Sequence, residues 1–243
     1  MKLSIMAILL AATISTAASA QSQWGLGVGA IVSDKGYVDI GNESTVIPMV
    51  FYQSESFYLL GPKFGYKWLV FDDVNIDLVG QYRFDGYKED DGDIFQGMED
   101  RSGALDLGLS VDYKTAWGDL SFEYLTDATN EHKGNEMSLS YSKPYGSKSL
   151  QITPYVKVNR FSEDLVDYYY GVRANEETAS RAVYIGEATT NIELGVKATW
   201  RVGKHHNFIG YTSYTAYGAE IEDSPLIDSS GNLSLLLGYM YVF

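Results

Sequence analysis

The sequence predicts an all-β fold: a transmembrane antiparallel β-barrel of about 12 strands, with about 10 as the alternative. Three observations favour this class. Apolar and polar residues alternate through runs of about ten residues or more, longer than the roughly five or six of soluble strands. The connections between these runs alternate between short and long, as in barrels with turns at one end and loops at the other. The chain ends on an alternating strand, residues 233–243, whose last residue is aromatic.

Every second side chain of the C-terminal strand is apolar and points to one face, and Ser234, Gly238 and Met240 lie on the other face. Its length suits a tilted membrane-crossing strand, which needs about 9–11 residues. Its aromatic end resembles the assembly signal that the barrel-assembly machinery reads in Gram-negative bacteria. The residues of this predicted signal are Tyr239, Tyr241 and Phe243. A strand of a soluble β-sandwich is the alternative, because alternation alone does not separate the two folds.

The first 20 residues have the pattern of a secretory signal peptide. Lys2 precedes an apolar run over residues 5–12, and the small residues 18–20 follow it. The apolar run is too short to span a bilayer as a helix. We therefore expect cleavage after Ala20 and one exported barrel domain over residues 21–243.

Composition excludes several function classes. The formal net charge of −14 argues against binding to nucleic acid. With no cysteine, the chain has no disulfide, no thiolate nucleophile and no cysteine zinc site. Twenty Tyr and 24 Gly, against five Pro, suit many strands with aromatic girdles and tight turns.

The middle of the chain alternates most clearly, over residues 74–85, 105–114 and 192–202. Connections are expected at residues 72–73, 86–103, 116–118, 127–135, 145–148, 161–187, 203–206 and 218–231. They alternate in length, which a sandwich does not require.

The N-terminal third is less regular. Residues 24–32, 45–53 and 57–70 are predicted strands, which brings the total to an odd number. A single-chain barrel needs an even number. A break near Gly61 and Pro62 would supply the missing strand.

The parity predicted to face the lumen mixes charges of both signs: Asp77, Arg83, Asp85, Asp106, Asp112, Lys114, Glu123, Lys157, Glu193, Lys197 and Arg201. In a narrow barrel such charges should pair, because an isolated charge removed from water is costly. There is no ring of one sign, which an ion-selective channel would favour. A packed polar interior and a pore both remain open.

No catalytic, cofactor or metal site is predicted. His132 is expected in a solvated loop, and His205 and His206 in a short turn, without a third metal ligand nearby in sequence. The acidic run at residues 89–93 resembles part of a calcium loop but lacks the later bidentate Glu. We therefore interpret residues 89–93 as a solvated loop, or as a loop bridged by cations near lipopolysaccharide.

Several loop motifs occur in a fixed order: GMEDR at 97–101, DYYYGV at 167–172, NEETASR at 175–181 with Tyr184, and DSPLID at 223–228. With the terminal GYMYVF, this ordered set resembles the MipA/OmpV family of outer-membrane proteins. The N-terminal match is weaker, although Pro48 fits it. The motif residues taken as structural or partner-binding are Met98, Asp100, Arg101, Tyr169, Tyr170, Gly171, Val172, Arg181, Tyr184, Asp223, Ser224 and Pro225.

The resemblance implies a non-enzymatic barrel in the Gram-negative outer membrane, in contact with lipid and lipopolysaccharide and without a cofactor. In one branch it implies a scaffold for a murein-hydrolysing lytic transglycosylase and a murein synthase. The periplasmic turns around residues 72–73, Trp117, Gly146 and His205 would then be the contact surface. A passive channel for small solutes, and a surface adhesin or antibiotic-response porin-like protein, are the alternatives.

Overall fold

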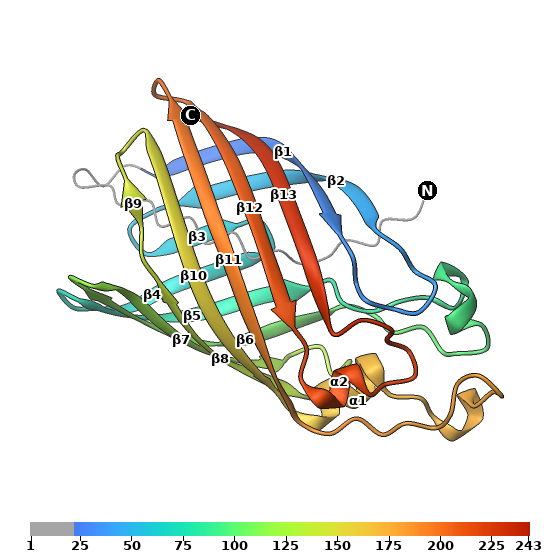
Figure 1. Cartoon of the computed structure of the whole chain (residues 1–243). Coiled ribbons are helices and arrows are strands. Elements are labelled where there is room, and N and C mark those ends of the chain that lie inside the picture. Colours follow the sequence, from blue (N-terminus) through green and yellow to red (C-terminus); the bar gives the residue numbers. More distant parts are fainter. Residues whose placement is uncertain (1–21) are drawn as a thin grey trace.

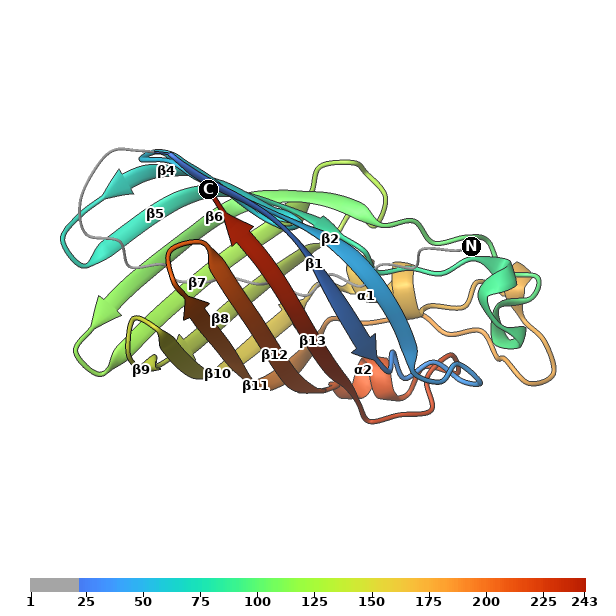
Figure 2. The ribbon, with the colours of Figure 1, turned by 90° about the horizontal axis from the view of Figure 1, so that it is seen from above.

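The computed structural model describes residues 22–243, so the predicted signal peptide lies outside the described residues. These residues form a closed antiparallel barrel of 12 strands (Figures 1 and 2). Each strand pairs with the next, and the last pairs with the first. The strands are β1 (Gln23–Ser33), β2 (Glu43–Gln53), β3 (Phe57–Leu60), β4 (Lys63–Val70), β5 (Val74–Arg83), β6 (Ala104–Thr115), β7 (Gly118–Asp127), β8 (Asn135–Ser142), β10 (Leu150–Phe161), β11 (Thr189–Val202), β12 (His206–Ala216) and β13 (Gly231–Val242). The two-residue β9 (Tyr145–Gly146) pairs only with β10.

The predicted break in residues 57–70 is confirmed and gives the even count. Gly61 adopts a positive φ of 61°, a conformation that favours glycine, and Pro62 follows it. The chain reverses there, so that β3 has only four residues and β4 has eight. This hairpin is much shorter than its neighbours.

The C-terminal strand closes the barrel, as predicted, and the sandwich alternative is wrong. β13 pairs with β1 from Gly25 opposite Val242 to Ser33 opposite Ser234. Leu233, Leu235 and Leu237 are exposed on the outer face, whereas Ser234, Leu236 and Met240 are buried on the inner face. Phe243 stacks on Trp24 with ring centroids 3.8 Å apart, and its N–H donates to the Trp24 carbonyl at 2.9 Å.

The connections separate into two ends. Short turns lie at one end of the barrel, where Figure 1 places the C-terminus, and this is the turn end. Long loops gather at the loop end and contain α1 (Glu163–Tyr170), α2 (Ala219–Glu222), η1 (Glu89–Asp91), η2 (Asp93–Phe95) and η3 (Ala174–Glu176). The predicted connections agree with these to within a few residues, but the short helices were not predicted.

No helix among residues 22–243 is long and apolar enough to cross a membrane.

Candidate functional site

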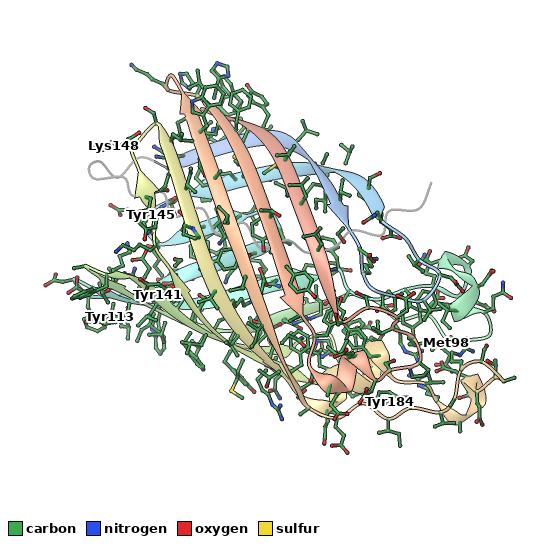
Figure 3. All side chains as sticks on the ribbon, in the orientation of Figure 1. Met98, Tyr113, Tyr141, Tyr145, Lys148 and Tyr184 are labelled. Carbon is green, nitrogen blue, oxygen red and sulfur yellow. The ribbon has the colours of Figure 1, made fainter. Side chains whose placement is uncertain are left out.

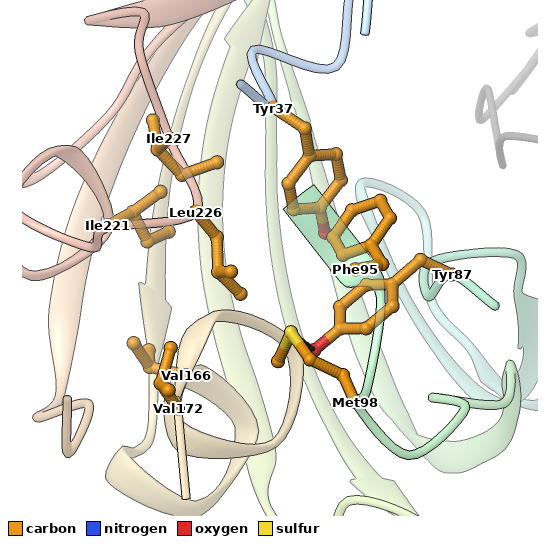
Figure 4. Packing of buried hydrophobic residues seen from close by; sticks show 9 residues of the cluster. All are labelled: Tyr37, Tyr87, Phe95, Met98, Val166, Val172, Ile221, Leu226 and Ile227. Atoms are coloured by element: carbon orange, nitrogen blue, oxygen red, sulfur yellow. Dashed lines mark hydrogen bonds between the residues drawn. The ribbon is translucent and has the colours of Figure 1, made fainter. Parts of the chain in front are cut away.

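The long loops pack into one body, the loop cap, formed by residues 34–42, 84–103, 128–134, 162–188 and 217–230. Its centre is a buried apolar cluster drawn from four of these loops (Figure 4). The members are Tyr37, Tyr87, Phe95, Met98, Val166, Val172, Ile221, Leu226 and Ile227. The ring of Tyr37 packs edge-on against Tyr87 and Phe95, with centroids 5.9 Å and 5.2 Å away. Loops that are far apart in sequence are thereby held to one another.

Arg101 and Glu176 form a buried ion pair that joins the second and fourth loops of the cap. Arg101 Nη2 donates to both carboxylate oxygens of Glu176, at 3.0 Å and 2.9 Å. The rest of the guanidinium donates to the carbonyls of Tyr168 and Glu99, at 2.8 Å and 2.7 Å. Glu176 also accepts from the N–H groups of Glu99 and Arg173. With both groups satisfied in this way, the pair is held in a single geometry.

The surroundings of Glu176 determine its protonation. Burial disfavours the charged carboxylate, but the hydrogen bonds from Arg101 and from two backbone N–H groups outweigh it. They lower the pKa of Glu176 below its ordinary value. The carboxylate is therefore the form that holds the cap together.

Arg181 serves the same junction through backbone groups. Its guanidinium donates to the carbonyls of Ile94, Gln96 and Glu176. Because carbonyls at chain reversals have no strand partner, a five-donor side chain can satisfy several of them. Arg181 thus fixes the backbone of η2 against η3.

The tyrosine-rich motif lies inside the cap. Tyr169 is buried and donates its hydroxyl to the Ser102 carbonyl at 3.1 Å. Tyr170 packs against the apolar cluster, and its carbonyl accepts from the Ser224 hydroxyl at 2.6 Å. Tyr184 donates to the Glu220 carbonyl at 2.8 Å and pairs with Val172. These contacts join the fourth loop to the second and the fifth.

The other motif residues occupy the same region. Met98 belongs to the buried cluster, and Asp100 accepts from the Glu89 N–H at 2.9 Å. A Cβ at Gly171 would lie 2.3 Å from the Asp167 carbonyl oxygen, so only glycine fits this end of α1. Pro225 is half-buried next to Ser224, whereas Asp223 is exposed.

Sequence reasoning did not single out Glu176, Tyr37 or Phe95. Glu176 is one of two adjacent glutamates in a polar stretch, and nothing local distinguishes it from Glu177. The buried role of Phe95 had a signal in the sequence: Ile94 and Phe95 are adjacent apolar residues inside an otherwise acidic loop.

His132 is buried at 2% exposure, so the prediction of a solvated histidine is wrong. Its Nδ1 accepts from the Gly134 N–H at 3.1 Å, which places the proton on Nε2. Nε2 then donates to Asp106 Oδ1 at 2.9 Å. Both ring nitrogens are used, as in a structural histidine that orders its loop.

Asp106, Asp127 and His132 offer ligand atoms within 4.8 Å of one another. The Asp127 carboxylate already accepts from Thr129, Asn130 and Lys133. Both ring nitrogens of His132 are hydrogen-bonded as well. These side chains therefore stabilise a tight turn. The acidic run at 89–93 is used similarly: Glu89 and Asp91 accept from the N–H groups of Gly97 and Lys88.

Several of the charges predicted to face the barrel interior pair with opposite charges, whereas Asp77 keeps a buried carboxylate oxygen without a hydrogen-bond partner. Arg83 contacts Asp106 at 2.9 Å, Asp85 at 3.1 Å and Glu136 at 2.6 Å. Lys157 lies 3.6 Å from Glu136, in line with the expectation that signs would compensate. Further members of the network are Lys63 with Glu123, and Tyr155 and Tyr211 with Glu193.

The turn end carries aromatic and apolar side chains instead of a packed body. Figure 3 shows Tyr113, Tyr141 and Tyr145 towards this end, and Met98 and Tyr184 at the other. Trp117 is 78% exposed at the tip of the turn between β6 and β7. Val70 and Phe71, at the neighbouring turn between β4 and β5, are 63% and 59% exposed. The carbonyl of Asp73 accepts from the Lys114 N–H at 2.8 Å, which ties the two turns together.

The two histidines of the last turn brace the C-terminal strand. His205 Nδ1 lies 2.7 Å from the Val242 carbonyl oxygen, and its ring stacks on Tyr241. His206 Nδ1 lies 2.8 Å from the Tyr239 hydroxyl.

Comparison with known proteins gives consistent matches. The family described as MltA-interacting protein MipA matches residues 26–243. Outer membrane protein Omp26La of Vibrio anguillarum is 28% identical over 69% of this chain and 71% of that protein. The MltA-interacting protein of Escherichia coli K12 is 27% identical over 100% of this chain and 99% of that protein. A NanC porin structure has a TM-score of 0.48 at 7% identity, covering 89% of this chain and 98% of that one.

The family match spans almost all of the described barrel, and the relatives are named as outer-membrane proteins of Gram-negative bacteria. The turn end, with both chain ends of the barrel, is then periplasmic and the loop cap is extracellular. The chain belongs to the MipA family and is an outer-membrane β-barrel.

Proposed function

We propose that this barrel is a non-catalytic scaffold whose periplasmic turns hold a murein-processing enzyme at the outer membrane. The observation that carries the proposal is the pair of adjoining turns with exposed Val70, Phe71 and Trp117. Large apolar side chains exposed in water mark interaction sites. Val70 lies opposite Asn75, on the face of the sheet that turns inward with buried Asp77. Because the Val70 side chain lies on this inward face, it does not anchor the barrel in lipid.

The name of a relative indicates the kind of partner. The Escherichia coli relative is named as a protein that interacts with MltA. For this chain we propose a lytic transglycosylase as the first partner, and a murein synthase as a second. The turns around residues 72–73, Trp117, Gly146 and His205 are the proposed contact surface, with the first two at its centre.

Binding between the purified barrel in detergent and the purified lytic transglycosylase of the same cell tests the proposal. Replacing Val70 and Phe71 together by Ser should weaken binding by about tenfold or more, which is about 1.4 kcal/mol. The matched control is Val183→Ser, an exposed residue of the loop cap at the opposite end of the barrel, which should bind like the wild type. Equal affinities of all three proteins, or no binding by the wild type, would exclude this contact surface.

A passive channel is the rival outcome. Because the loop cap joins loops from several sides of the barrel and Arg83 is paired with Asp106 and Glu136 across the interior, we expect no conductance steps in planar bilayers. Regular steps would favour the channel over the scaffold.

A further inference from the structure

The short connections at the turn end divide into two groups by charge. Three neighbouring connections have three acidic residues between them and no Lys or Arg: 54–56, 71–73 and 116–117. The next two around the barrel contain three Lys residues and no Asp or Glu: 143–149 and 203–205. These two connections, with Arg201 at the end of β11, form what we call the basic side. The exposed apolar residues of the proposed enzyme contact lie in the other group.

The two turns of the basic side are tied to one another. The Arg201 N–H donates to the Ser149 carbonyl at 2.7 Å, and Arg201 Nη1 donates to the Lys148 carbonyl at 3.3 Å. The turn that carries Lys204 is braced against β13 by His205, whose Nδ1 lies 2.7 Å from a backbone carbonyl. The cations are therefore presented from one ordered backbone surface, which lowers the entropic cost of binding a partner.

These cations are available to a partner. Lys148 and Lys204 are exposed, and Figure 3 shows Lys148 near Tyr145 at this end of the barrel. Within residues 22–243, neither lysine nor Arg201 forms an ion pair with a carboxylate. The C-terminal carboxylate belongs to Phe243, whose ring stacks on Trp24 of β1. Because the whole chain has a net charge of −14, the basic side is where an anionic partner would be attracted.

The basic side lies beyond the lipid-facing surface. An outward aromatic row crosses the neighbouring strands, in which Trp200 packs against Phe208 with centroids 5.3 Å apart. Such rows lie at the membrane–water interface. At about 3.3 Å per residue, Val202 is roughly 7 Å past Trp200 along β11. Lys204 lies farther still, between the end of β11 and the start of β12. Its ammonium group is thus placed towards the periplasm.

We propose that the basic side binds murein through the free carboxylates of its stem peptides. Murein is the polyanion that lies next to the outer membrane in the periplasm, and its carboxylates repeat along the polymer. Lys and Arg donate charge-assisted hydrogen bonds to carboxylates, and several weak contacts on one polymer reinforce one another. The anionic lipid headgroup is the competing partner, but the position of Lys204 beyond the aromatic row favours the polymer.

The proposal goes beyond the scaffold function and rests only on the periplasmic position of the turn end. It assigns the turns around Gly146 and His205, at the margin of the proposed enzyme surface, to the substrate of that enzyme. The barrel would then hold an enzyme and its polymer on neighbouring parts of one face.

Sedimentation of the purified barrel with isolated murein sacculi tests this, in non-ionic detergent at low salt and without any enzyme or lipid. The test variant is Lys148→Gln with Lys204→Gln. The matched control is Lys88→Gln with Lys133→Gln, which removes two exposed lysines of the loop cap and changes the net charge equally. Arg201 is kept, because its guanidinium also holds the Lys148 turn. Sacculi whose carboxyl groups have been amidated are the second probe.

We expect the test variant to bind sacculi about fivefold or more weakly than the wild type, and the control to bind like the wild type. High salt should release the wild type, because exposed charges are screened. Amidated sacculi should not bind. Heat-modifiable migration on gels confirms that each variant has folded.

Three outcomes would overturn the proposal: no binding by the wild type, equal binding by the test variant and the control, or equal binding of native and amidated sacculi. Weaker binding of the test variant to phosphatidylglycerol vesicles, with murein binding unchanged, would assign the basic side to lipid instead. The scaffold proposal is judged separately, because the test variant should bind the lytic transglycosylase like the wild type. Conversely, the variant with Val70 and Phe71 replaced by Ser should keep its murein binding.

Discussion

The two ends of the barrel use apolar residues in opposite ways. At the loop end, Phe95, Leu226 and Ile221 are fully buried among loops that have no regular sheet of their own. At the turn end, Trp117, Val70 and Phe71 stand exposed on turns of a few residues. Long loops supply enough chain to build a core, whereas short turns cannot cover their own side chains. The difference shows that the loop end has a core of its own, whereas the turn end leaves large apolar side chains exposed.

The largest expected effect on this contrast is the loss of the buried ion pair. Arg101→Met leaves Glu176 buried without its cation, and removing one partner of such a pair costs about 3–5 kcal/mol. We expect the loop cap to become sensitive to protease at a temperature where the wild type resists. Arg173→Met is the control, because the Arg173–Glu99 pair is exposed and such pairs contribute about 0–1 kcal/mol. Equal resistance of both variants would mean that the pair does not hold the cap.

A cavity in the cap core should rank next. Leu226→Ala removes a fully buried side chain, and such truncations cost about 2–5 kcal/mol. Limited proteolysis of the loops, with the barrel itself intact by heat-modifiable migration, measures the effect. Val183→Ala, an exposed residue of the same cap, should change little. If the barrel unfolds together with the loops, the two are one cooperative unit and the contrast between the ends is smaller than described.

Acidification should loosen the cap by a smaller amount. The pKa of Glu176 is lower in the folded protein, so on acidification the unfolded chain takes up this proton first. The free energy of unfolding therefore decreases as the pH is lowered. The contribution is complete above the ordinary glutamate pKa and is lost as pH falls through the lowered value. Proteolysis of the loops by an acid protease across this pH range measures the loss of stability. In Glu176→Gln the part of the pH dependence due to this group should vanish; an unchanged profile would assign it elsewhere.

The smallest effect is expected at the turn end, where β13 pairs with β1 and closes the barrel. Phe243→Ala removes the stack on Trp24, worth about 0.5–1.5 kcal/mol, while the backbone hydrogen bond remains. We expect slower assembly and a lower midpoint in heat-modifiability. Leu233→Ala, on the same face of β13 at the loop end, is the control. A larger loss from Leu233→Ala would contradict a special role for the terminal aromatic residue.

Much of the barrel followed from local pattern. Alternation at period two located β5, β6, β11 and β13, and the turn residues Gly61 and Pro62 gave the split that completes the strand count. The mixed signs on the inward-facing residues correctly indicated pairing for Arg83, Asp106 and Lys157, but not for Asp77. The order of the loop motifs indicated the family. It did not indicate that Arg101 pairs with Glu176, or that the Arg181 guanidinium donates to backbone carbonyls.

Other features depend on residues that are distant in sequence. His132 is preceded and followed by charged or polar residues, and only closure of the barrel places Asp106 beside it. The partly unpaired edge of β2 likewise arises because the short β3 pairs only with its last three residues, which depends on register. By itself the sequence determined strand positions, loop lengths and which parity meets lipid, because these are local properties of a pleated chain. The tertiary structure decided which charges meet, what the loops bury and which strand edge stays unpaired, because those contacts exist only once the sheet has closed.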